Sequence, residues 1–369
     1  MKTIIFIVSS TFYNADGYSI RIITEVEKLK KYFRVILYLP HHPKENTIDL
    51  SEYKIIYYDT YYEGQFHYLK NLFSFRKTLK QLLRKYTNAI ICGESLIPSL
   101  KSIGISKKYN CLYVYDCHGT EPHEFMMKHS SIFGRIVGIG LTFFEKIVVN
   151  NSDLIITVTD KQYRMFGVKK NHVVFPMMPT NEFVEKSVDN RYEIRKALGI
   201  NEFDEVYVYS GQNQKWQMCE ETIDIYKTIA EHRSNTRLVI YTLQTQFFKE
   251  LCIKKGIYDA IIITVAHNEM YRYLDACDFG FCIRNNSIVN QVASPTKILE
   301  YVSRNVMPII SDSVGDFSLQ FKNNNIGIVW EGKTDYTRPI NYDGHTYVQK
   351  MNLRKKNEYI NAFKKLLTK

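Results

Sequence analysis

A helix start that carries a cation is the chemically most informative pattern in the sequence. Ser294 is followed by Pro295, and this pair predicts a helix with Ser294 as its N-cap and Pro295 as its first helical residue. The first backbone N–H groups of a helix have no partner within it and lie at the positive end of the helix dipole. Lys297, in the first turn, adds a full positive charge. Such a group of donors is suited to bind an anion, for example a phosphate.

Two further charged side chains are predicted to lie near this helix start. Glu300 follows Ser294 by six residues, and its carboxylate could accept hydrogen bonds from sugar hydroxyls. Arg284 leaves a predicted strand toward the same region. The alternative interpretation is an ordinary cap, with Lys297 and Glu300 solvated. It is less favoured because a lysine beside a helix N-terminus is unfavourable unless an anion is bound there.

Titratable side chains also gather after a predicted strand that ends at Tyr115. Asp116, His118, Glu121 and Glu124 follow this strand. In a doubly wound sheet, ligands bind beyond the carboxyl ends of the strands. A histidine and carboxylates at that edge can hydrogen-bond a polyhydroxyl ligand or assist proton transfer. For Asp116 or His118 alone, capping of the next helix is the better interpretation, but the whole cluster favours a functional site.

The loop after the first predicted strand, residues 9–19, is polar and holds a single glycine, Gly17. It lacks the GxGxxG fingerprint, and a GxxxxGK[ST] phosphate loop does not occur in the sequence. The loop is either ligand-facing or a solvated connection. The sequence therefore argues against a dinucleotide oxidoreductase and a P-loop ATPase.

These residues need parallel strands to position them. Apolar runs rich in Ile, Val and Tyr alternate with amphipathic segments, which is typical of βαβ units. The predicted strands are 4–8, 35–39, 55–58, 89–92, 111–115, 154–158, 173–175, 206–209, 238–241, 261–264, 279–283 and 307–310. Helices are predicted at 220–232, 295–303 and 353–367, and Ile22, Val26, Leu29 and Phe33 mark the apolar face of another. We expect an α/β protein with two Rossmann-like, doubly wound parallel-sheet domains that face a cleft.

The chain has 369 residues, which is long for one hydrophobic core. Its hydrophobic pattern lapses between Met177 and Asp189. We expect an N-terminal domain over residues 1–178, a linker over 179–190, a C-terminal domain over 191–345 and a basic C-terminal helix within 346–369 that packs back.

Cysteine usage and the N-terminal run indicate the compartment. The seven cysteines are scattered, form no CxxC pair and lie mostly in apolar runs, which predicts buried free thiols in a reducing cytosol. The apolar run 4–8 ends too early for a signal peptide and predicts a buried strand. No run approaches the roughly 18 apolar residues of a membrane span. We expect a cytoplasmic protein, either soluble or peripheral on the inner membrane face.

The formal net charge of +11 predicts an anionic partner. Residues 70–85 hold six basic and no acidic side chains, with Leu72, Phe75, Leu79, Leu82 and Leu83 available for an apolar face. Two interpretations stay open for this segment: a helix on an anionic membrane surface, or a domain helix with a solvated basic face. The apolar run 136–144 predicts a core helix rather than a membrane element.

The segment 294–310, SPTKILEYVSRNVMPII, resembles the donor-binding segment of GT-B glycosyltransferases of the glycosyltransferase family 4 type, whose pattern is SPxKxxEYxxxGxPVI. Residues 153–159 resemble the strand that closes the N-terminal domain of that family, and residues 115–124 resemble its acceptor-side loop. The resemblance implies a GT-B fold, a nucleotide-diphosphate sugar as the donor, and neither a cofactor nor a metal. It also implies that Lys297 and Arg284 neutralise the diphosphate, that Glu300 binds the ribose, and that His118 faces the transferred sugar.

The resemblance thus carries over three groups of residues. The catalytic residues are His118, Lys297 and Glu300; the donor-binding residues are Gly17, Ser210, Gly211, Lys215, Arg284, Asn290, Ser294, Pro295 and Thr296; the acceptor-side residues are Asp116, Glu121 and Glu124. The chain departs from the pattern at three places. Val292 replaces the first of two motif glutamates, whose role is lost or taken by Asn290. Lys215 alone remains of an Arg and Lys pair, and Asn305 replaces a glycine.

The expected activity is a retaining transfer of a sugar to a glycan or lipid-linked acceptor in surface polysaccharide biosynthesis. Preorganised cations would stabilise the charge that develops on the leaving diphosphate. That phosphate would help to remove the proton of the acceptor, which attacks from the same face. No DxD-type carboxylate pair that could hold magnesium is evident. Two alternatives remain: a GT-B-fold sugar-nucleotide epimerase, and a non-catalytic, basic, membrane-binding protein. Nucleic acid is not an expected partner, because no motif for it is evident.

Overall fold

The computed structural model describes residues 1–8, 12, 17–41, 50–60, 67–180, 190–339 and 341–368. The chain forms two compact units, each with its own sheet. The first unit consists of Met1–Pro176 and Lys355–Lys369, and the second unit consists of Met177–Arg354. The predicted linker over residues 179–190 falls mainly on residues 181–189, which lie outside the described residues.

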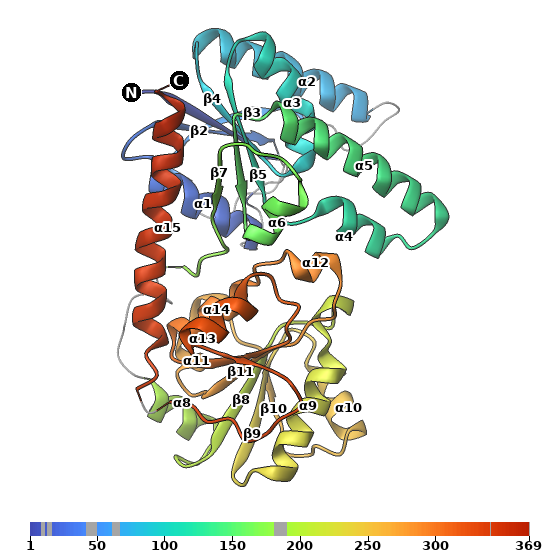
Figure 1. The fold of residues 1–369 in the computed structure, drawn as a ribbon, viewed down its shortest axis with the longest axis vertical. Coiled ribbons are helices and arrows are strands. Elements are labelled where there is room, and N and C mark those ends of the chain that lie inside the picture. Colours follow the sequence, from blue (N-terminus) through green and yellow to red (C-terminus); the bar gives the residue numbers. More distant parts are fainter. Residues whose placement is uncertain are drawn as a thin grey trace. The chain divides into compact units, whose positions relative to one another are not determined.

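A seven-stranded parallel sheet forms the centre of the first unit (Figure 1). Its order is β3-β2-β1-β4-β5-β6-β7. The strands are β1 (Thr3–Ile7), β2 (Arg34–Pro40), β3 (Lys54–Tyr58), β4 (Ile90–Glu94), β5 (Leu112–Cys117), β6 (Leu154–Thr157) and β7 (His172–Val174). All seven strands predicted in this half are confirmed, with shifts of one or two residues at their ends.

Helices cover both faces of this sheet. They are α1 (Gly17–Leu29), α2 (His67–Lys85), α3 (Leu96–Lys108), α4 (Glu121–Lys128), α5 (Ile132–Asn151) and α6 (Asp160–Met165). The predicted face of α1 is confirmed for Ile22, Val26 and Leu29, which are buried, whereas Phe33 is buried but lies beyond the end of the helix. Helices α2, α3 and α5 share one hydrophobic core with the sheet, so they form a layer on the same face.

The second unit repeats this design with six parallel strands in the order β10-β9-β8-β11-β12-β13. They are β8 (Glu205–Ser210), β9 (Thr236–Tyr241), β10 (Ile261–Ile263), β11 (Phe279–Cys282), β12 (Met307–Ile310) and β13 (Ile328–Val329). Strand β13, which has two residues, was not predicted. The helices are α8 (Arg191–Leu198), η1 (Lys215–Gln217), α9 (Cys219–His232), α10 (Thr245–Lys254), η2 (His267–Glu269), α11 (Met270–Leu274), α12 (Ile288–Gln291), α13 (Thr296–Ser303) and α14 (Phe317–Asn324).

The last helix, α15 (Gly344–Leu366), begins nine residues before the predicted Leu353. Its residues from Lys355 onward belong to the first unit, where Tyr359 and Phe363 are fully buried and Tyr359 packs against Phe175. All seven cysteines are buried free thiols, and β1 is buried throughout, as predicted. Within the described residues, no helix is long and apolar enough to cross a membrane.

Candidate functional site

In the second unit, α13 is fastened to the ends of β8 and β11 by Tyr301. The Tyr301 ring lies against Gly280 of β11, where an added Cβ would come within 2.4 Å of the ring. The Tyr301 hydroxyl accepts the backbone N–H of Ser210 at 3.0 Å and is 2.7 Å from the Ser210 Oγ. Through these contacts Tyr301 holds α13 against β11 and beside the carboxyl end of β8.

Lys297 lies at this junction. Its Nζ donates to the backbone oxygen of Ser210 at 2.6 Å and to Oε1 of Gln217 in η1 at 3.2 Å. It also lies 4.8 Å from the centroid of the Tyr209 ring. Gly211 makes room for this arrangement, since a Cβ at that position would be 2.4 Å from Gln217 Oε1 and 3.1 Å from Lys297 Nζ. The predicted residues Ser210, Gly211 and Lys297 are therefore brought together.

Arg284 is a second cation that contacts the η1 turn. It follows β11 directly, its side chain is buried, and Nη1 donates to the backbone oxygen of Trp216 at 3.1 Å. The backbone N–H of Arg284 donates to Ser311 Oγ at 2.8 Å, which fixes the end of the strand. Lys215 also lies in η1, and its side chain is exposed.

Neither Arg284 nor Lys297 has a carboxylate partner within the described part of the chain. The hydrogen bonds of both side chains go to carbonyl oxygens of the backbone or of an amide. Burial lowers the pKa of Lys297 to about 8, since desolvation disfavours the ammonium form. A buried cation without a counterion is unfavourable by itself. Chemically, the two cations are suited to neutralise an anionic ligand at this junction.

The helix start differs from its prediction by one residue. Pro295, with φ −62° and ψ 122°, is the N-cap, and Thr296 is the first helical residue. Ser294 precedes the N-cap, and its Oγ accepts a hydrogen bond from the backbone N–H of Met177 at 3.2 Å. Thr296 and Lys297 are the first two residues of α13, and their backbone N–H groups have no carbonyl partner within the helix. Such N–H groups are what an anion site at a helix start requires.

Glu300 and Asn290 have separate surroundings. Glu300 is largely buried, and its Oε1 is 3.7 Å from Nε2 of His267. The Asn290 side chain donates to the backbone oxygen and to Oδ1 of Asn285, at 3.1 and 2.7 Å. The Asn290 side chain thus stabilises the loop that contains Asn285. Asn305, at the position of the family glycine, has a φ of 58°, a left-handed conformation that asparagine tolerates better than most residues.

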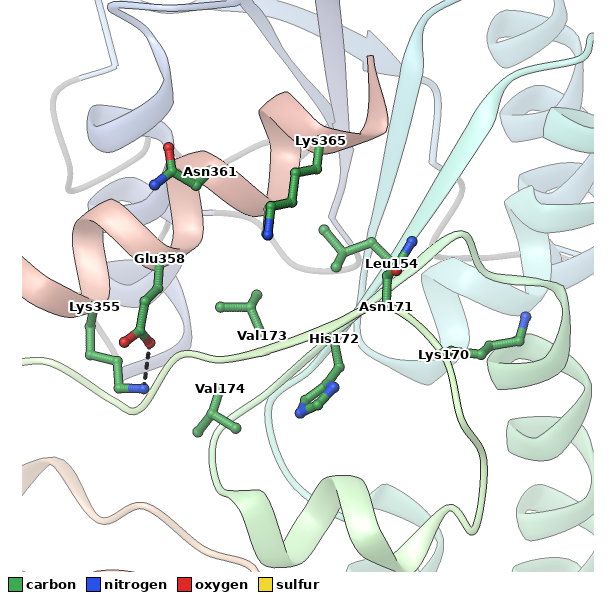
Figure 2. A pocket seen from close by; sticks show the side chains of 11 residues that line it. Leu154, Lys170, Asn171, His172, Val173, Val174, Lys355, Glu358, Asn361 and Lys365 are labelled. Carbon is green, nitrogen blue, oxygen red and sulfur yellow. Dashed lines mark hydrogen bonds and ion pairs between the residues drawn. The ribbon is translucent and has the colours of Figure 1, made fainter. Parts of the chain in front are cut away.

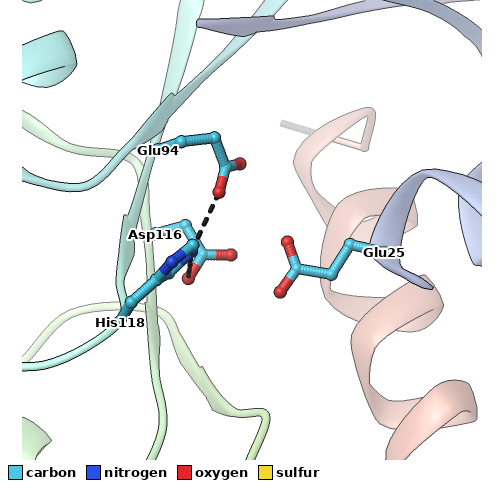
Figure 3. A group of neighbouring side chains, drawn as sticks. All are labelled: Glu25, Glu94, Asp116 and His118. Carbon is cyan, nitrogen blue, oxygen red and sulfur yellow. Dashed lines mark ion pairs between the residues drawn. The ribbon is translucent and has the colours of Figure 1, made fainter. Parts of the chain in front are cut away.

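The first unit holds a buried charged cluster at the carboxyl ends of β4 and β5 (Figure 3). Glu94 and Asp116 are paired positions on these neighbouring parallel strands, so their carboxylates lie side by side. His118 Nε2 is 2.9 Å from Glu94 Oε2 and 3.4 Å from Asp116 Oδ1. Ser95, directly after Glu94, has φ 75° and ψ −179°, a strained conformation that mostly glycine adopts.

Helix α1 completes the cluster with Arg21 and Glu25. The Arg21 guanidinium lies 2.8 Å from Glu25 Oε1 and 3.0 Å from Asp116 Oδ1, and it donates to the backbone oxygen of Phe175 at 2.9 Å. Tyr359 of α15 donates to Glu25 Oε2 at 3.3 Å. Sequence reasoning found Asp116 and His118 but missed Arg21, Glu25 and Glu94. A signal existed for α1, since Arg21 and Glu25 immediately precede Ile22 and Val26 of its buried face.

In the cluster, the pKa of each group reflects the effect of burial and the effect of the neighbouring charges. Burial raises the pKa of Glu25 well above its ordinary value, and burial together with Asp116 raises the pKa of Glu94. Burial alone would raise the pKa of Asp116 too, but Arg21 and His118 lower it to about 2. Burial and Arg21 act to lower the pKa of His118, but Asp116 and Glu94 outweigh them and raise it. Arg21 and His118 thus favour the ionised form of Asp116, whereas burial favours the protonated forms of Glu25 and Glu94.

Four ligand atoms, from Glu25, Glu94, Asp116 and His118, lie within 4.8 Å of one another. Carboxylates and a histidine are suitable metal ligands in general. Here, however, the Arg21 guanidinium contacts two of the three carboxylates and supplies the positive charge. The cluster therefore has the chemistry of an internal ion network.

The other predicted residues of the first unit lie around α4. Neither Asp116 nor His118 caps this helix, because its N-cap is Thr120. Glu121 accepts the backbone N–H of Leu96 at 2.5 Å, and burial raises the pKa of both Glu121 and Glu124. Gly17 begins α1, and the loop residues 9–11 and 13–16 lie outside the described residues.

A separate cavity of about 610 Å³ lies between the edge strand β7 and α15 (Figure 2). Its lining includes Lys170, His172, Lys365 and the ion pair of Lys355 with Glu358, whose side chains are 2.7 Å apart. None of the predicted site residues lines this cavity.

The chain resembles known proteins through its fold. No family model and no curated protein sequence matches it. Sucrose-phosphate synthase from Thermosynechococcus elongatus has a TM-score of 0.67 at 12% identity, with 98% of this chain and 92% of that chain covered. HepE of Anabaena, solved with UDP and glucose, has a TM-score of 0.63 at 13% identity, covering 98% and 94%. WaaG, a glycosyltransferase involved in lipopolysaccharide biosynthesis, gives 0.63 at 13%, covering 98% and 92%. The predicted fold is confirmed: these are GT-B glycosyltransferases, and two parallel-sheet α/β units match them over nearly the whole chain.

Proposed function

We propose that this protein is a glycosyltransferase that takes its sugar from a nucleotide-diphosphate donor bound in the second unit. The observation that carries the proposal is the pair of cations Arg284 and Lys297 near the first turn of α13, which have no carboxylate partner among the described residues. A diphosphate supplies the missing negative charge and accepts hydrogen bonds from helix N–H groups. The fold supports the proposal, since HepE, which shares it, was solved with UDP and with UDP-glucose.

The chemistry follows from the same charges. When the bond to the sugar breaks, negative charge develops on the leaving phosphate, and the two preorganised cations stabilise it. Glu300 lies one turn further along α13, in reach of a ribose by its position on the helix. We propose retention of the anomeric configuration, with same-face attack and proton removal assisted by the leaving phosphate. This mechanism needs no metal, so we expect turnover to be insensitive to EDTA.

For the acceptor, we propose a chemical class rather than a single molecule. We infer a glycan or a lipid-linked glycan of surface polysaccharide biosynthesis, with Asp116, His118, Glu121 and Glu124 on the acceptor side. The ion network supports a positioning role for His118, because its Nε2 faces Glu94 and Asp116. The basic helix α2 supports an anionic membrane surface as a partner, on the cytoplasmic side.

A thermal-shift series against UDP, GDP, dTDP and their sugars tests donor binding, since a ligand that binds the native state alone raises its apparent stability. We expect one nucleotide to shift the wild type and to shift Lys297→Ala far less. Glu300→Gln should reduce the shift less than Lys297→Ala does, because it keeps both cations for the diphosphate and weakens only the contact with the ribose, and it should lower turnover. Lys227→Ala, at an exposed position of α9, is the matched control.

Two outcomes would overturn the assignment: no shift with any nucleotide, or normal turnover in both Lys297→Ala and Glu300→Gln. Conversion of the nucleotide sugar without an acceptor would indicate an epimerase instead.

A further inference from the structure

Helix α5 exposes an apolar face, although its central run was predicted to be a core helix. That prediction is wrong for the outward side chains: Ile136, Ile139 and Phe143 are 62%, 66% and 62% exposed. The complete set of large apolar side chains exposed on this helix is Ile132, Phe133, Ile136, Ile139, Phe143, Phe144 and Ile147. Isolated exposed apolar residues are common, but seven on one helix form a patch that indicates an interaction surface.

The spacing of these residues puts them on one side of the helix. At about 100° per residue, all seven fall within an arc of roughly 140°. The opposite side is packed: Val148 and Val149 belong to the core of the first unit, and Gly138 lies against Met126 of α4. A Cβ at Gly138 would come within 2.1 Å of the Met126 side chain, so the two helices approach closely. This packing fixes the rotation of α5 and leaves its apolar face outward.

The exposed charges of residues 67–152, which form the helices around this face, are of one sign. Residues 67–152 are all described, and they contain twelve Lys and Arg side chains, of which all but Lys101 are exposed. The five carboxylates of this stretch are Glu94, Asp116, Glu121, Glu124 and Glu145, and none is exposed. On α5 itself, Arg135 and Lys146 flank one edge of the apolar arc. The outward surface of the layer is therefore both apolar and basic.

Helix α2 extends this surface in the same layer. Its inner face, Phe75, Leu79, Leu82 and Leu83, is buried in the core, so residues 70–85 belong to a helix of the first unit whose basic side chains face outward. At its N-terminal end, Tyr68, Leu69 and Phe73 are exposed. A hollow of about 620 Å³ lies there, and the described residues that line it are apolar side chains, Ser74, Lys70, Arg76, Lys77 and Asp59.

We propose that the outer face of α5 inserts into the interface of an anionic lipid bilayer while the cations of α2 and α3 bind its headgroups. The distribution of charge favours this partner over a second copy of the chain, because pairing two α5 faces would bring like charges together. An apolar face combined with a basic surface is what interfacial binding requires. In this proposal α5 lies in the plane of the interface, with its apolar arc toward the lipid.

This surface would give the first unit access to an acceptor that is anchored in the membrane. That functional meaning rests on the proposed glycosyl transfer to a lipid-linked acceptor. The membrane binding itself does not, because it can be measured without donor, acceptor or turnover.

Flotation of the full-length chain with vesicles tests the inference. We expect the wild type to float with vesicles of phosphatidylcholine and phosphatidylglycerol, and much less with phosphatidylcholine alone. The triple variant Ile136→Ser, Ile139→Ser, Phe143→Ser should lose binding by roughly tenfold or more, since each inserted side chain contributes through its buried apolar area. The matched control is Phe203→Ser with Tyr258→Ser, two comparably exposed side chains of the second unit, which should float like the wild type.

Fluorescence provides an independent reading. Tryptophan emission of Ile139→Trp should shift to the blue when anionic vesicles are added, and that of Leu319→Trp, at a 63% exposed position of α14, should not. The inference is overturned if the triple variant floats like the wild type or if the wild type does not float. It is also overturned if the wild type is a dimer in sedimentation velocity that the triple variant converts to monomer. A nucleotide-induced thermal shift in the triple variant separates the two proposals, because donor binding should survive there.

Discussion

At the scale of single residues, Lys297 gives donor binding a pH dependence. Its pKa is lowered to about 8, and only the ammonium form attracts a diphosphate. We therefore expect the affinity for UDP to be constant below that pKa and to fall by about tenfold per pH unit above it. Titration calorimetry between neutral pH and the alkaline limit of stability measures this. In Lys297→Arg the guanidinium stays charged, so the alkaline decline should vanish; a decline of unchanged slope would assign it to another group.

The same lysine should affect stability with the opposite sign. Folding lowers its pKa from the ordinary 10.5, so the native state disfavours the bound proton. The contribution of Lys297 to the free energy of unfolding therefore rises as the pH increases through about 8 toward the unfolded value. Between about pH 8 and the ordinary lysine pKa of 10.5, donor affinity should fall while the stability of the free protein rises. Opposite trends of this kind are expected of a buried lysine whose charge serves to bind a ligand.

The ion network of the first unit predicts unequal costs for two similar substitutions. Asp116→Asn removes the ionised partner of Arg21 and His118, and we expect it to lower the free energy of unfolding by about 3–5 kcal/mol at neutral pH. Glu25→Gln should cost far less, because the raised pKa of Glu25 already favours its neutral form. Urea unfolding measures both.

Their pH profiles provide a check on this assignment. The stabilisation from Asp116 is present above its unfolded pKa and is lost as the pH falls toward about 2. The contribution of Glu25 is present at low pH and is lost as the pH rises through its raised pKa, so Glu25→Gln should flatten that decline. Equal losses in the two variants at neutral pH would show that Glu25 is ionised in the native state.

At the scale of elements, the contact of α13 with β11 positions Lys297. A methyl group in Gly280→Ala would meet the Tyr301 ring at 2.4 Å, so the ring and its helix must move. We expect about 1–3 kcal/mol of destabilisation and a weaker UDP affinity, both measured by thermal unfolding with and without nucleotide. Gly104→Ala is the control, because its Cβ would meet nothing within 4 Å and should not destabilise. Unchanged UDP affinity in Gly280→Ala would show that this contact does not position the lysine.

Sequence reasoning worked well for elements whose burial is uniform or strictly periodic. The predicted strands are confirmed because both faces of a parallel sheet are covered, which leaves continuous apolar runs. The prediction for α5 was wrong because the run from Ile136 to Phe144 is apolar on every side of the helix. Such a run predicts burial all round, and the sequence does not show which side packs against the core. The cluster was found in part because Asp116 and His118 are sequence neighbours, whereas Arg21 and Glu94 reach it only through the fold. Lys297 was predicted because the motif contains it, and Arg284 was predicted because it directly follows a predicted strand that leads toward the same region.

At the scale of the whole molecule, the two proposals assign the positive charge to two separate tasks. The cations proposed to bind the donor, Arg284 and Lys297, are few and buried, whereas the cations of α2 and α3 proposed to bind a membrane are mostly exposed. The net charge of +11 therefore describes the surface rather than the donor site. Each unit has its own sheet and core. A ligand that binds one unit should therefore slow the hydrogen exchange of backbone amides mainly in that unit.

Hydrogen exchange of the full-length chain with a saturating nucleotide should show this separation. We expect the amides of residues 209–217 and of the first turn of α13 to exchange roughly ten to a hundred times more slowly, because the diphosphate contacts them and stabilises this site by mass action. Exchange in β4, β5 and α1 of the first unit should change little with the nucleotide alone. In Lys297→Met the protection should disappear, while Lys227→Met should behave as the wild type. Protection centred on Glu94 and His118 instead would place the nucleotide in the first unit and contradict the donor assignment.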